Sequence, residues 1–281
     1  VYDSTAIRHG LDNAAEKYLS HKTIHYEDIT GKGVKQIPFS KVDIETAAEY
    51  SCEDVLVSYE LYNYLWAKVS EDENIIKVYK NIEIPLVPIL SNIERNGVLI
   101  ESKTLNELSK ELDLELKKIE KKCFKITKKD FNLNSPKQLQ EILYEDLKIP
   151  ISKKTPTGKP STDEDTLQFL SESYDLPRLI LDYRSLNKLK TGYTDKLPLQ
   201  ISKITGRVHT SYQQAITSTG RLSSTEPNLQ NIPIKSSQGK KIRNAFIAGK
   251  GKKIFAADYS QIELRIMAHL SGDKNLLKAF K

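Results

Sequence analysis

The strongest structural signal in the sequence is a row of apolar residues spaced three or four apart. The row consists of Leu105, Leu108, Leu112, Leu116, Ile119 and Cys123. This spacing places all of them on one face of a single long helix. Ser102 stands just before the row and is a candidate N-cap, because a serine side chain can accept hydrogen bonds from the free amides of a first helical turn.

Helical signals continue on both sides of this row. Residues 43–69 carry apolar and aromatic residues at mixed spacings of three and four, which predicts a helix. The run Ile-Pro-Leu-Val-Pro at 84–88 is expected to break any helix, because each proline lacks an amide donor and restricts the residue before it. We therefore predict a domain boundary near these prolines.

Shorter helices are predicted further along the chain. Ser135 and Pro136 have the pattern of an N-cap followed by a first helical position. Residues 153–162 lack periodicity and predict an exposed loop, whose last two residues, a serine and a threonine, would cap a helix over 163–173. A further helix is expected from 177 to about 197. This part of the chain is therefore predicted to be mainly helical.

The pattern changes after residue 201. Stretches rich in Gly, Ser, Thr and Asn separate short β-branched runs at 207–212 and 253–257, which predict strands. Ser260 would then cap a helix with an apolar stripe. The stripe consists of Ile262, Ile266, Met267 and Leu270. The predicted fold class is mixed α/β, in which a helix-rich part precedes the start of a sheet.

Charge is unevenly distributed along the chain. The net charge is +6, yet residues 1–84 carry nine basic and fifteen acidic residues, whereas residues 201–281 carry fourteen basic and four acidic residues. Interspersed signs are typical of a solvated surface, so the basic end predicts a polyanionic partner. Charge alone leaves open a basic solvated tail with no partner. A salt slope of about −0.9 per phosphate contact would distinguish the two.

Composition excludes several classes of protein. No run approaches the roughly 20 apolar residues of a membrane span, and no secretory signal opens the chain. Cys52 and Cys123 indicate neither a disulfide framework nor a zinc cluster, as in a reducing cytosol. We therefore expect a cytoplasmic protein without membrane contact. We also expect a longer parent chain, because the sequence starts at Val1 and its single methionine is Met267.

The run Asp-Tyr-Ser-Gln-Ile-Glu-Leu-Arg, residues 258–265, joins a predicted strand end to a predicted helix start. A carboxylate such as Asp258 at this position, in a basic surround, is a hard oxygen ligand that suits Mg²⁺. Asp258 could instead be a helix-start carboxylate that is stabilised by the helix dipole. Glu263 completes a capping box with Ser260, and that structural role would explain it without chemistry.

Three segments together resemble family A DNA polymerases, in particular the bacterial DNA polymerase I enzymes. They are Thr-Gly-Arg-Leu-Ser-Ser at 219–224, Pro-Asn-Leu-Gln-Asn-Ile-Pro at 227–233, and residues 258–265. The resemblance runs almost unbroken from Thr205 to Phe280. It implies attack of a primer 3'-hydroxyl on the α-phosphate of a dNTP, with two metal ions that stabilise the attacking and leaving oxygens.

The same resemblance implies roles for individual residues. Asp258 would hold the catalytic Mg²⁺ ions, with the Tyr259 carbonyl as a further ligand, and Tyr259 and Gln261 are assigned to the cofactor site. Glu263 would be the gate that excludes a ribose 2'-hydroxyl, a role that is compatible with capping. The second metal-binding carboxylate and the helix that holds the dNTP are expected beyond Lys281. We therefore expect this chain alone not to polymerise nucleotides.

Several polar residues are candidates for contacts with DNA. Arg221, Asn228, Gln230 and Asn231 can donate to the acceptors N3 and O2 that a base pair presents in the minor groove. The resemblance implies that these positions line the groove near the primer terminus. Amides in a proline-flanked loop often satisfy local turns instead, and this remains the alternative for the three amides. Arg265 could reach a primer phosphate or lie on an exposed helix face, and the resemblance favours the phosphate.

Arg184 and Lys188 lie four residues apart, and therefore on one face of the helix predicted over 177–197. Their segment resembles the thumb that holds the product duplex in family A polymerases. Asp182 and Asp195 offer the alternative of surface ion pairs, each worth about 0.3–0.5 kcal/mol. The sequence supports the two interpretations evenly.

Tyr50 and Asp54 also lie four residues apart on one predicted helix face, where a phenol and a carboxylate could hold a metal ion and its water. A core tyrosine and a surface aspartate are the alternative. Residues 11–64 resemble the end of a 3'-5' exonuclease domain, in which this tyrosine orients the attacking water and this aspartate binds metal. Residues 43–45 read Asp-Ile-Glu, which we interpret as helix-start charge and not as the metal-binding Asp-x-Glu of that site, expected upstream.

These interpretations combine into three predicted regions. Residues 1–78 would end a 3'-5' exonuclease domain, residues 79–200 would form the entry segment and a helical thumb, and residues 201–281 would begin an antiparallel palm sheet. The predicted function is template-directed DNA synthesis in replication and repair, with an associated 3'-5' exonuclease. The expected partners are primer-template DNA and dNTP, and the parent is expected to be a monomeric, nucleoid-associated bacterial protein.

Two alternative functions remain open. The first is a stand-alone 3'-5' exonuclease, which Tyr50 and Asp54 support but which leaves residues 258–265 unexplained. The second is a non-catalytic duplex-binding module whose basic end contacts phosphates. This module would bind DNA without any Mg²⁺ dependence at Asp258.

Overall fold

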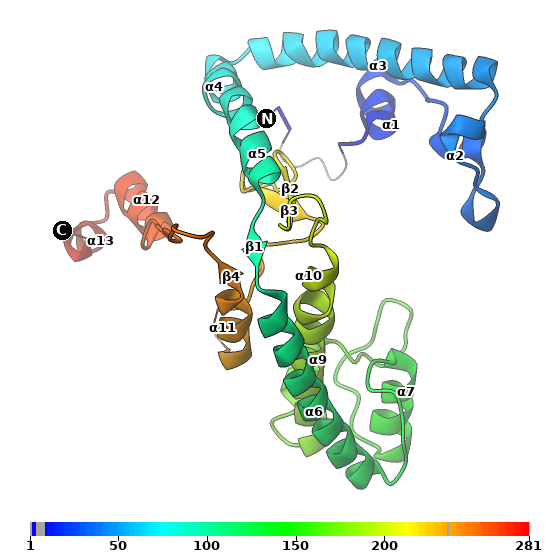
Figure 1. The fold of residues 1–281 in the computed structure, drawn as a ribbon, viewed down its shortest axis with the longest axis vertical. Helices are drawn as coiled ribbons and strands as arrows, with labels where there is room; N and C mark the ends of the chain where they lie inside the picture. The colour runs from blue at the N-terminus through cyan, green and yellow to red at the C-terminus, as the bar shows by residue number, and fades with distance from the viewer. Residues whose placement is uncertain (1, 4–8, 235, 281) are drawn as a thin grey trace.

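The structure is a computed structural model that describes residues 2–3, 9–234 and 236–280. Figure 1 shows two helical bodies joined by a narrow waist of short strands, with the last two helices set to one side. One body contains α1 to α5, and the other is built around α6 and α9. The predicted combination of many helices with small antiparallel sheets is confirmed. No described helix is long and apolar enough to cross a membrane.

The N-terminal body, residues 9–96, is organised along helix α3, Ile44–Ser70. Asp43 caps this helix, and its carboxylate accepts hydrogen bonds from the Glu45 and Thr46 amides at 3.1 and 3.2 Å. The interpretation of residues 43–45 as helix-start charge is therefore confirmed. The other elements before residue 79 are α1 (Leu11–Ala14), the π-helix η1 (Ala15–Leu19), α2 (Tyr26–Thr30), the 3-10 turns η2 (Gly33–Lys35) and η3 (Phe39–Lys41), and α4 (Glu73–Val78).

The proline run at 84–88 does not break a helix, so that prediction is wrong. Helix α5 spans Ile84–Asn96 and contains Pro85 in its first turn and Pro88 one turn later. The π-helix η4, Tyr79–Glu83, directly precedes α5. Such wider turns commonly occur where a helix lacks an i to i−4 hydrogen bond.

Helix α6, Ser102–Thr127, confirms the long apolar row. Five members of the row are buried, namely Leu105, Leu108, Leu112, Leu116 and Cys123. The N-cap is Glu101 and not Ser102, because the chain leaves strand β1 in an extended conformation at Glu101 and is already helical at Ser102. Burial raises the pKa of the Cys123 thiol to about 11, and both cysteines are free as predicted.

The second body, called the bundle here, spans residues 102–199 and consists of α6 packed along α9, Asp175–Leu189. Two apolar clusters fill it, one around Leu139, Ile142 and Ile180 and the other around Leu105, Leu112 and Leu197. The remaining elements are α7 (Pro136–Gln140), the π-helix η5 (Glu141–Asp146), α8 (Glu164–Leu170), the π-helix η6 (Lys190–Thr194) and α10 (Lys196–Leu199).

Helix caps in the bundle agree in part with the sequence. The Ser135 hydroxyl accepts a hydrogen bond from the Gln138 amide, which confirms the cap of α7. Helix α8 is capped by Asp163, which accepts from the Thr166 amide at 2.9 Å, so the predicted cap at 161–162 is wrong. An aspartate satisfies the same free amides as a serine does. The helix predicted over 177–197 is divided in the structure. Helix α9 ends at Leu189, and η6 and α10 follow it.

The waist contains two small antiparallel sheets. Strand β1 (Leu99–Ile100) pairs with β4 (Phe246–Ile247), and β2 (Ser211–Gln213) pairs with β3 (Ser223–Thr225). The strand predicted at 207–212 is present only in part, through β2 and isolated bridges at Val208. Residues 253–257 are not a strand, because they have no hydrogen-bonded strand partner among the described residues.

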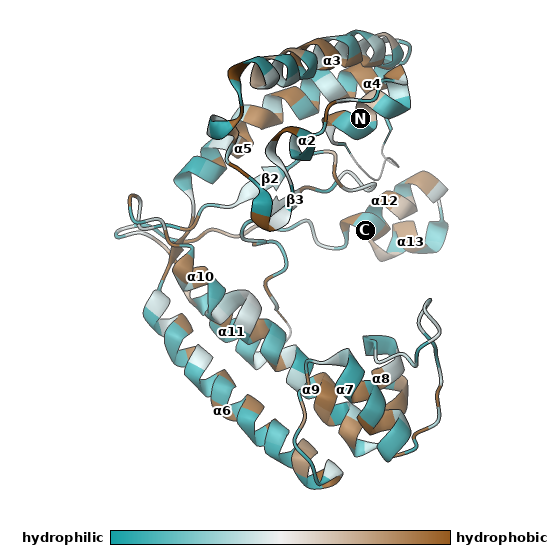
Figure 2. Ribbon diagram, turned by 90° about the vertical axis from the view of Figure 1, so that its right-hand side faces the viewer, coloured by the Kyte–Doolittle hydropathy of each residue, from teal (hydrophilic) through white to brown (hydrophobic). Residues whose placement is uncertain are grey.

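The arm, residues 252–280, follows helix α11 (Ser237–Asn244) and β4. It contains α12 (Ile262–Ser271) and α13 (Lys274–Ala279), which stand apart from both helical bodies in Figures 1 and 2. The predicted stripe of α12 is present in sequence but lies largely open, with Leu270 77% exposed. Gln261 in a left-handed conformation is the N-cap, so the predicted cap by Ser260 and its capping box with Glu263 are wrong.

Candidate functional site

A buried serine organises the turn that carries the candidate minor-groove amides. Ser224 lies in β3, and its hydroxyl accepts hydrogen bonds from the Leu229 and Gln230 amides at 3.1 and 3.3 Å. It donates to Asn228 Oδ1, which also accepts from the Gln230 amide at 3.0 Å. One amide oxygen is therefore used inside the turn, as the structural alternative predicted. The side chains of Asn228, Gln230 and Asn231 are all exposed.

Hydrogen bonds from the waist and from the bundle hold the backbone of the same turn. Thr210, which is buried, donates to the carbonyl oxygens of Thr225 and Pro227 at 3.1 and 2.7 Å. The Tyr193 hydroxyl, which comes from the bundle, donates to the Asn231 carbonyl oxygen. The backbone of the turn is thus held at both ends, whereas its amide side chains face outward. Such a surface presents hydrogen-bond donors on a rigid support.

Asp258 and Tyr259 lie in the irregular segment that enters α12. Asp258 is exposed, and the Tyr259 side chain is 82% exposed. Gln261, the next assigned residue, has φ of +56° at the helix start. The structure therefore leaves the Asp258 carboxylate open to solvent, neither sealed in an apolar interior nor used as a helix cap.

Glu263 and Arg221 meet directly. The Arg221 guanidinium donates to Glu263 Oε1 at 2.9 Å, although the two residues are 42 positions apart in the sequence. Arg265 Nε donates to the Ser260 carbonyl oxygen at 3.1 Å, and its guanidinium carbon lies 4.7 Å from the centre of the Phe280 ring. The structure thus joins two of the three recognised sequence segments at one place.

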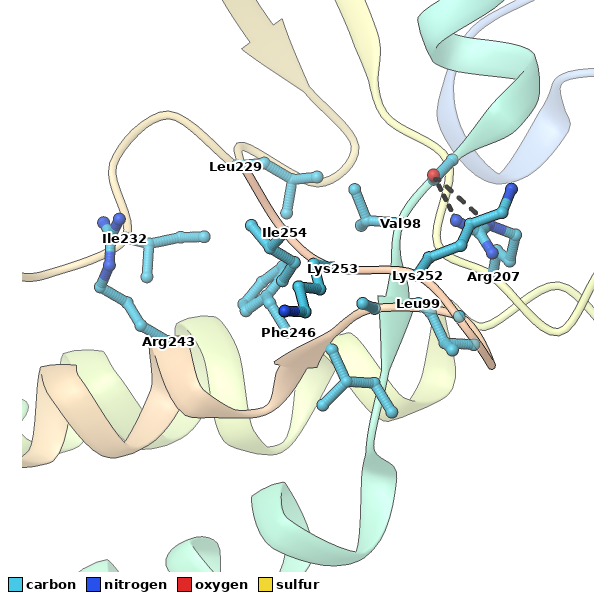
Figure 3. A pocket seen from close by; sticks show the side chains of 14 residues that line it. Val98, Leu99, Arg207, Leu229, Ile232, Arg243, Phe246, Lys252, Lys253 and Ile254 are labelled. Atoms are coloured by element: carbon cyan, nitrogen blue, oxygen red, sulfur yellow. Dashed lines mark hydrogen bonds between the residues drawn. The ribbon is translucent and has the colours of Figure 1, made fainter. Parts of the chain in front are cut away.

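A cleft of about 500 Å³ lies between β1, β4 and the segment that follows β4. Figure 3 shows an apolar floor with Arg243 on one side and Arg207 and Lys252 on the other. Arg207 donates twice to the Gly97 carbonyl oxygen, at 3.3 and 3.4 Å. These cations are not part of any recognised motif, although the run of basic residues at 240–253 was a signal for Arg243 and Lys252.

The two candidate thumb residues differ in their surroundings. Lys188 is exposed, whereas Arg184 is half-buried and donates to the Thr162 carbonyl oxygen at 2.6 Å. Burial lowers the pKa of Arg184. Asp195 pairs with Lys190 at 2.8 Å, and no described ion pair joins it or Asp182 to Arg184 or Lys188. Arg184 therefore supports the loop before α8, and Lys188 is free to meet a ligand.

Tyr50 and Asp54 lie on one face of α3, as their spacing predicted. Burial raises the pKa of the Tyr50 hydroxyl, and the neighbouring Asp54 carboxylate raises it further. The phenol therefore stays protonated and can donate a hydrogen bond. Among the described residues, no group of three or more histidine, cysteine, aspartate or glutamate side chains is placed to hold a metal ion, here or at Asp258.

A network that sequence reasoning missed lies beside Tyr50. Glu53 Oε1 contacts His21 Nε2 at 2.8 Å, and Glu53 Oε2 accepts from the Ile24 amide at 2.7 Å. Asp12 accepts from the Thr23 hydroxyl at 2.7 Å and contacts His25 Nδ1 at 3.1 Å. Glu53 stands between Tyr50 and Asp54 in the sequence, which was the available signal. This network fastens residues 21–25 to α1 and α3.

Comparison with known proteins gives the family of the chain. The profile of DNA polymerase family A matches residues 102–281. This chain belongs to DNA polymerase family A. It is 51% identical over its whole length to DNA polymerase I of Pseudomonas aeruginosa, of which it spans 31%. It is 43% identical, over 83% of its length, to the thermostable DNA polymerase I of Thermus aquaticus, of which it spans 28%.

A solved structure adds the fold. This chain is similar to the POL domain of Pol1 from M. smegmatis, with a TM-score of 0.78 and 33% sequence identity. That domain was solved in complex with DNA primer-template and dNTP. The match covers all of this chain and 45% of that one. The chain thus spans about a third of the length of its curated relatives.

The oxygen atoms at Asp258 can be compared with the ligands that the metal ions of family A polymerases prefer. One exposed carboxylate and a neighbouring main-chain carbonyl are oxygen donors, which hard divalent cations prefer. Magnesium is typically held by one or two carboxylates together with substrate phosphates and water. The residues present in this family A chain fit such a partial site, in which the substrate supplies the remaining ligands.

Proposed function

We propose that this chain is the primer-template-binding part of a template-directed DNA polymerase, active in replication and repair. The observation that carries the proposal is the contact of Arg221 with Glu263 at 2.9 Å, which brings two motifs together on the most basic part of the chain. Membership of family A supports it, and the similar M. smegmatis domain was solved with primer-template and dNTP. The proposed regions are residues 1–78, 79–200 and 201–281, as predicted from the sequence.

The minor groove of the primer-template would be read by residues 224–231, the turn that Ser224 organises and that we call the Ser224 turn. Asn228 uses its Oδ1 within the turn and keeps its amide hydrogens for the acceptors N3 and O2 of a base pair. Gln230 and Asn231 expose their side chains on the same surface. These acceptors occur on every correct base pair, so such donors bind without regard to sequence. The turn is held by Thr210 and Tyr193, which fixes the donors in space.

Phosphates would be bound by the basic side chains around the turn and by the bundle. Arg265 uses Nε for the Ser260 carbonyl and keeps its remaining guanidinium hydrogens for a primer phosphate. Lys188 would contact the duplex from the bundle, and Arg184 would act mainly by holding the loop before α8. Such contacts are salt-dependent because each releases counterions.

At the nucleotide end, the Asp258 carboxylate and the Tyr259 carbonyl would hold Mg²⁺. The bound ions would stabilise the attacking and leaving oxygens of the transfer. Gln261, at the start of α12, would contact the bound nucleotide, and Glu263 would exclude a ribose 2'-hydroxyl by occupying the space beside the sugar. Since no group of three or more histidine, cysteine, aspartate or glutamate side chains is assembled at Asp258 among the described residues, we expect the 281-residue chain to bind primer-template but not to extend it.

A second activity, 3'-5' exonuclease action, is supported by Tyr50 and Asp54. The raised pKa of Tyr50 keeps the phenol protonated beside a carboxylate, which suits a group that orients a water. The acidic character of residues 1–84 fits metal binding better than duplex binding. Asp54→Asn should lower Mg²⁺ affinity in this body, and unchanged affinity would remove Asp54 from the metal site.

We expect the protein to be a cytoplasmic, nucleoid-associated monomer.

Calorimetric titration tests the polymerase proposal. Mg²⁺ is added to the chain bound to primer-template, and the wild type is compared with Asp258→Asn and with Asp273→Asn, which changes the acidic residue that caps α13. We expect Asp258→Asn to abolish Mg²⁺ binding at the arm and Asp273→Asn to preserve it. Equal behaviour of the three proteins, with duplex binding intact, would favour a non-catalytic duplex-binding module. Loss of duplex binding in the wild type would contradict both.

A further inference from the structure

The ion pair between Arg221 and Glu263 joins two surfaces that the proposed function uses for different purposes. Arg221 lies in the turn before β3, and Glu263 lies in the first turn of α12. The two side chains are 75% and 72% exposed, so no packing holds them together. The contact therefore depends on the charges alone and can open without disturbing the core.

This pair also ties the arm to the rest of the molecule. Within residues 2–3, 9–234 and 236–280, it is the only hydrogen bond or ion pair that connects residues 255–280 with the remainder of the chain. The apolar stripe of α12 is largely open and adds little packing against the waist. The position of α12 relative to the Ser224 turn therefore depends on the pair and on the irregular segment before the helix.

A guanidinium that is paired with a carboxylate cannot offer the same hydrogens to DNA. The amino nitrogen Nη2 of Arg221 donates to Glu263 Oε1. A base-pair acceptor in the minor groove would compete for that donor. An exposed ion pair contributes only about 0.2–1 kcal/mol, which corresponds to a factor of about 1.4 to 5 in an equilibrium constant. A duplex can therefore replace it.

We propose that the Arg221–Glu263 pair is an autoinhibitory latch that primer-template binding opens. The inference rests on the proposed function and deepens it. In the free chain the latch keeps Arg221 from the minor groove and Glu263 from the sugar of the nucleotide. A duplex terminus takes Arg221, and this releases the Glu263 carboxylate to its gating position. Because linkage is reciprocal, the factor by which the latch weakens duplex binding equals the factor by which a duplex weakens the latch.

A double-mutant cycle on duplex binding tests the latch. Dissociation constants of a fluorescent primer-template are measured by anisotropy at low salt for the wild-type chain, Glu263→Gln, Arg221→Ala and the double variant. Glu226→Gln is the matched control, because it also removes one exposed carboxylate from the basic end but has no ion pair among the described residues. All substituted positions are exposed, and circular dichroism verifies that the variants fold.

We expect Glu263→Gln to tighten duplex binding about 1.4- to 5-fold more than Glu226→Gln does, because it frees Arg221. In the Arg221→Ala background, the extra gain should disappear. An equal gain in both backgrounds, or a gain no larger than that of Glu226→Gln, would overturn the latch and leave the proposed function standing. Absence of duplex binding by the wild-type chain would overturn the proposed function and the latch together.

Discussion

The bundle and the arm use similar apolar patterns with opposite results. In α6, Leu105 and Leu112 are fully buried against α9 and the waist. In the arm, Phe255 is 90% exposed and Leu270 is 77% exposed. The difference shows that an apolar stripe predicts a helix but not its partner. The residues with the most chemical meaning lie in the arm, where packing contributes least, whereas the bundle supplies the stability that holds the waist together.

The largest contrast between the two regions should appear in stability. Leu112→Ala removes a fully buried side chain from the bundle and should lower the free energy of unfolding by about 2–5 kcal/mol. Leu270→Ala removes a mostly exposed side chain from α12 and should change it by less than about 0.5 kcal/mol. Urea denaturation measures both. Similar losses in the two variants would show that the arm is packed as tightly as the bundle.

The junction between α5 and the waist should be the next most sensitive position. Gly97 has φ of +57°, and a Cβ there would lie 2.6 Å from the Val208 carbonyl oxygen. Gly97→Ala should therefore destabilise the chain by about 1–3 kcal/mol. Gly192 has open space around its Cβ position, so Gly192→Ala is the control and should cost less than about 1 kcal/mol. A neutral Gly97→Ala in the same denaturation assay would contradict the tight approach of α5 to the waist.

A smaller effect is expected from the difference in charge between the two ends of the chain. Lys252→Ala together with Lys253→Ala should make the slope of log affinity against log salt for primer-template shallower, by up to about 1.8. The same change at Lys35 and Lys77, in the acidic N-terminal body, should leave the slope unaltered. Anisotropy titrations at several salt concentrations measure both slopes. If the Lys35 and Lys77 pair changes the slope as much, the basic end is not the duplex-binding surface.

The smallest expected effect is a pH dependence inside the N-terminal body. The Ile24 amide, and then His21, lower the pKa of Glu53 below its unfolded value. The network therefore contributes its full stability above the unfolded pKa of about 4.3 and loses it as pH falls through the folded pKa. The protection of the Ile24 amide against hydrogen exchange, relative to its intrinsic exchange rate at each pH, should fall over that range. In Glu53→Gln, exchange should already be fast at neutral pH, and slow exchange there would contradict the network.

The sequence predicted the elements better than their ends. The rows at 43–69 and 102–123 were sufficient for α3 and α6, because apolar residues three or four apart predict a helix whether its surface is mostly open, as in α3, or buried on one face, as in α6. The caps at Ser102 and Ser260 were wrong, because the entry direction of the chain decides which residue is the last non-helical one. The prediction that the proline run breaks a helix was wrong, because the π-helix η4 precedes the run and Pro88 lies inside a helix that has already begun.

The candidate site was predictable in its residue types but not in its contacts. The motif at 258–265 pointed to the family that the comparisons then supplied. A strand at 253–257 was expected from β-branched residues, yet a strand also needs a partner, and none lies beside it among the described residues. The pairing of Arg221 with Glu263 depends on the fold of the waist, which no local pattern encodes.

Hydrogen–deuterium exchange of the 281-residue chain, with and without a primer-template duplex, tests the central claim most directly. The claim is that the duplex is bound by the Ser224 turn and the arm. Exchange should slow at residues 219–233 and 252–265 when the duplex is bound, and it should stay unchanged along α3. Protection confined to the N-terminal body, or binding with no protection at either segment, would contradict the account.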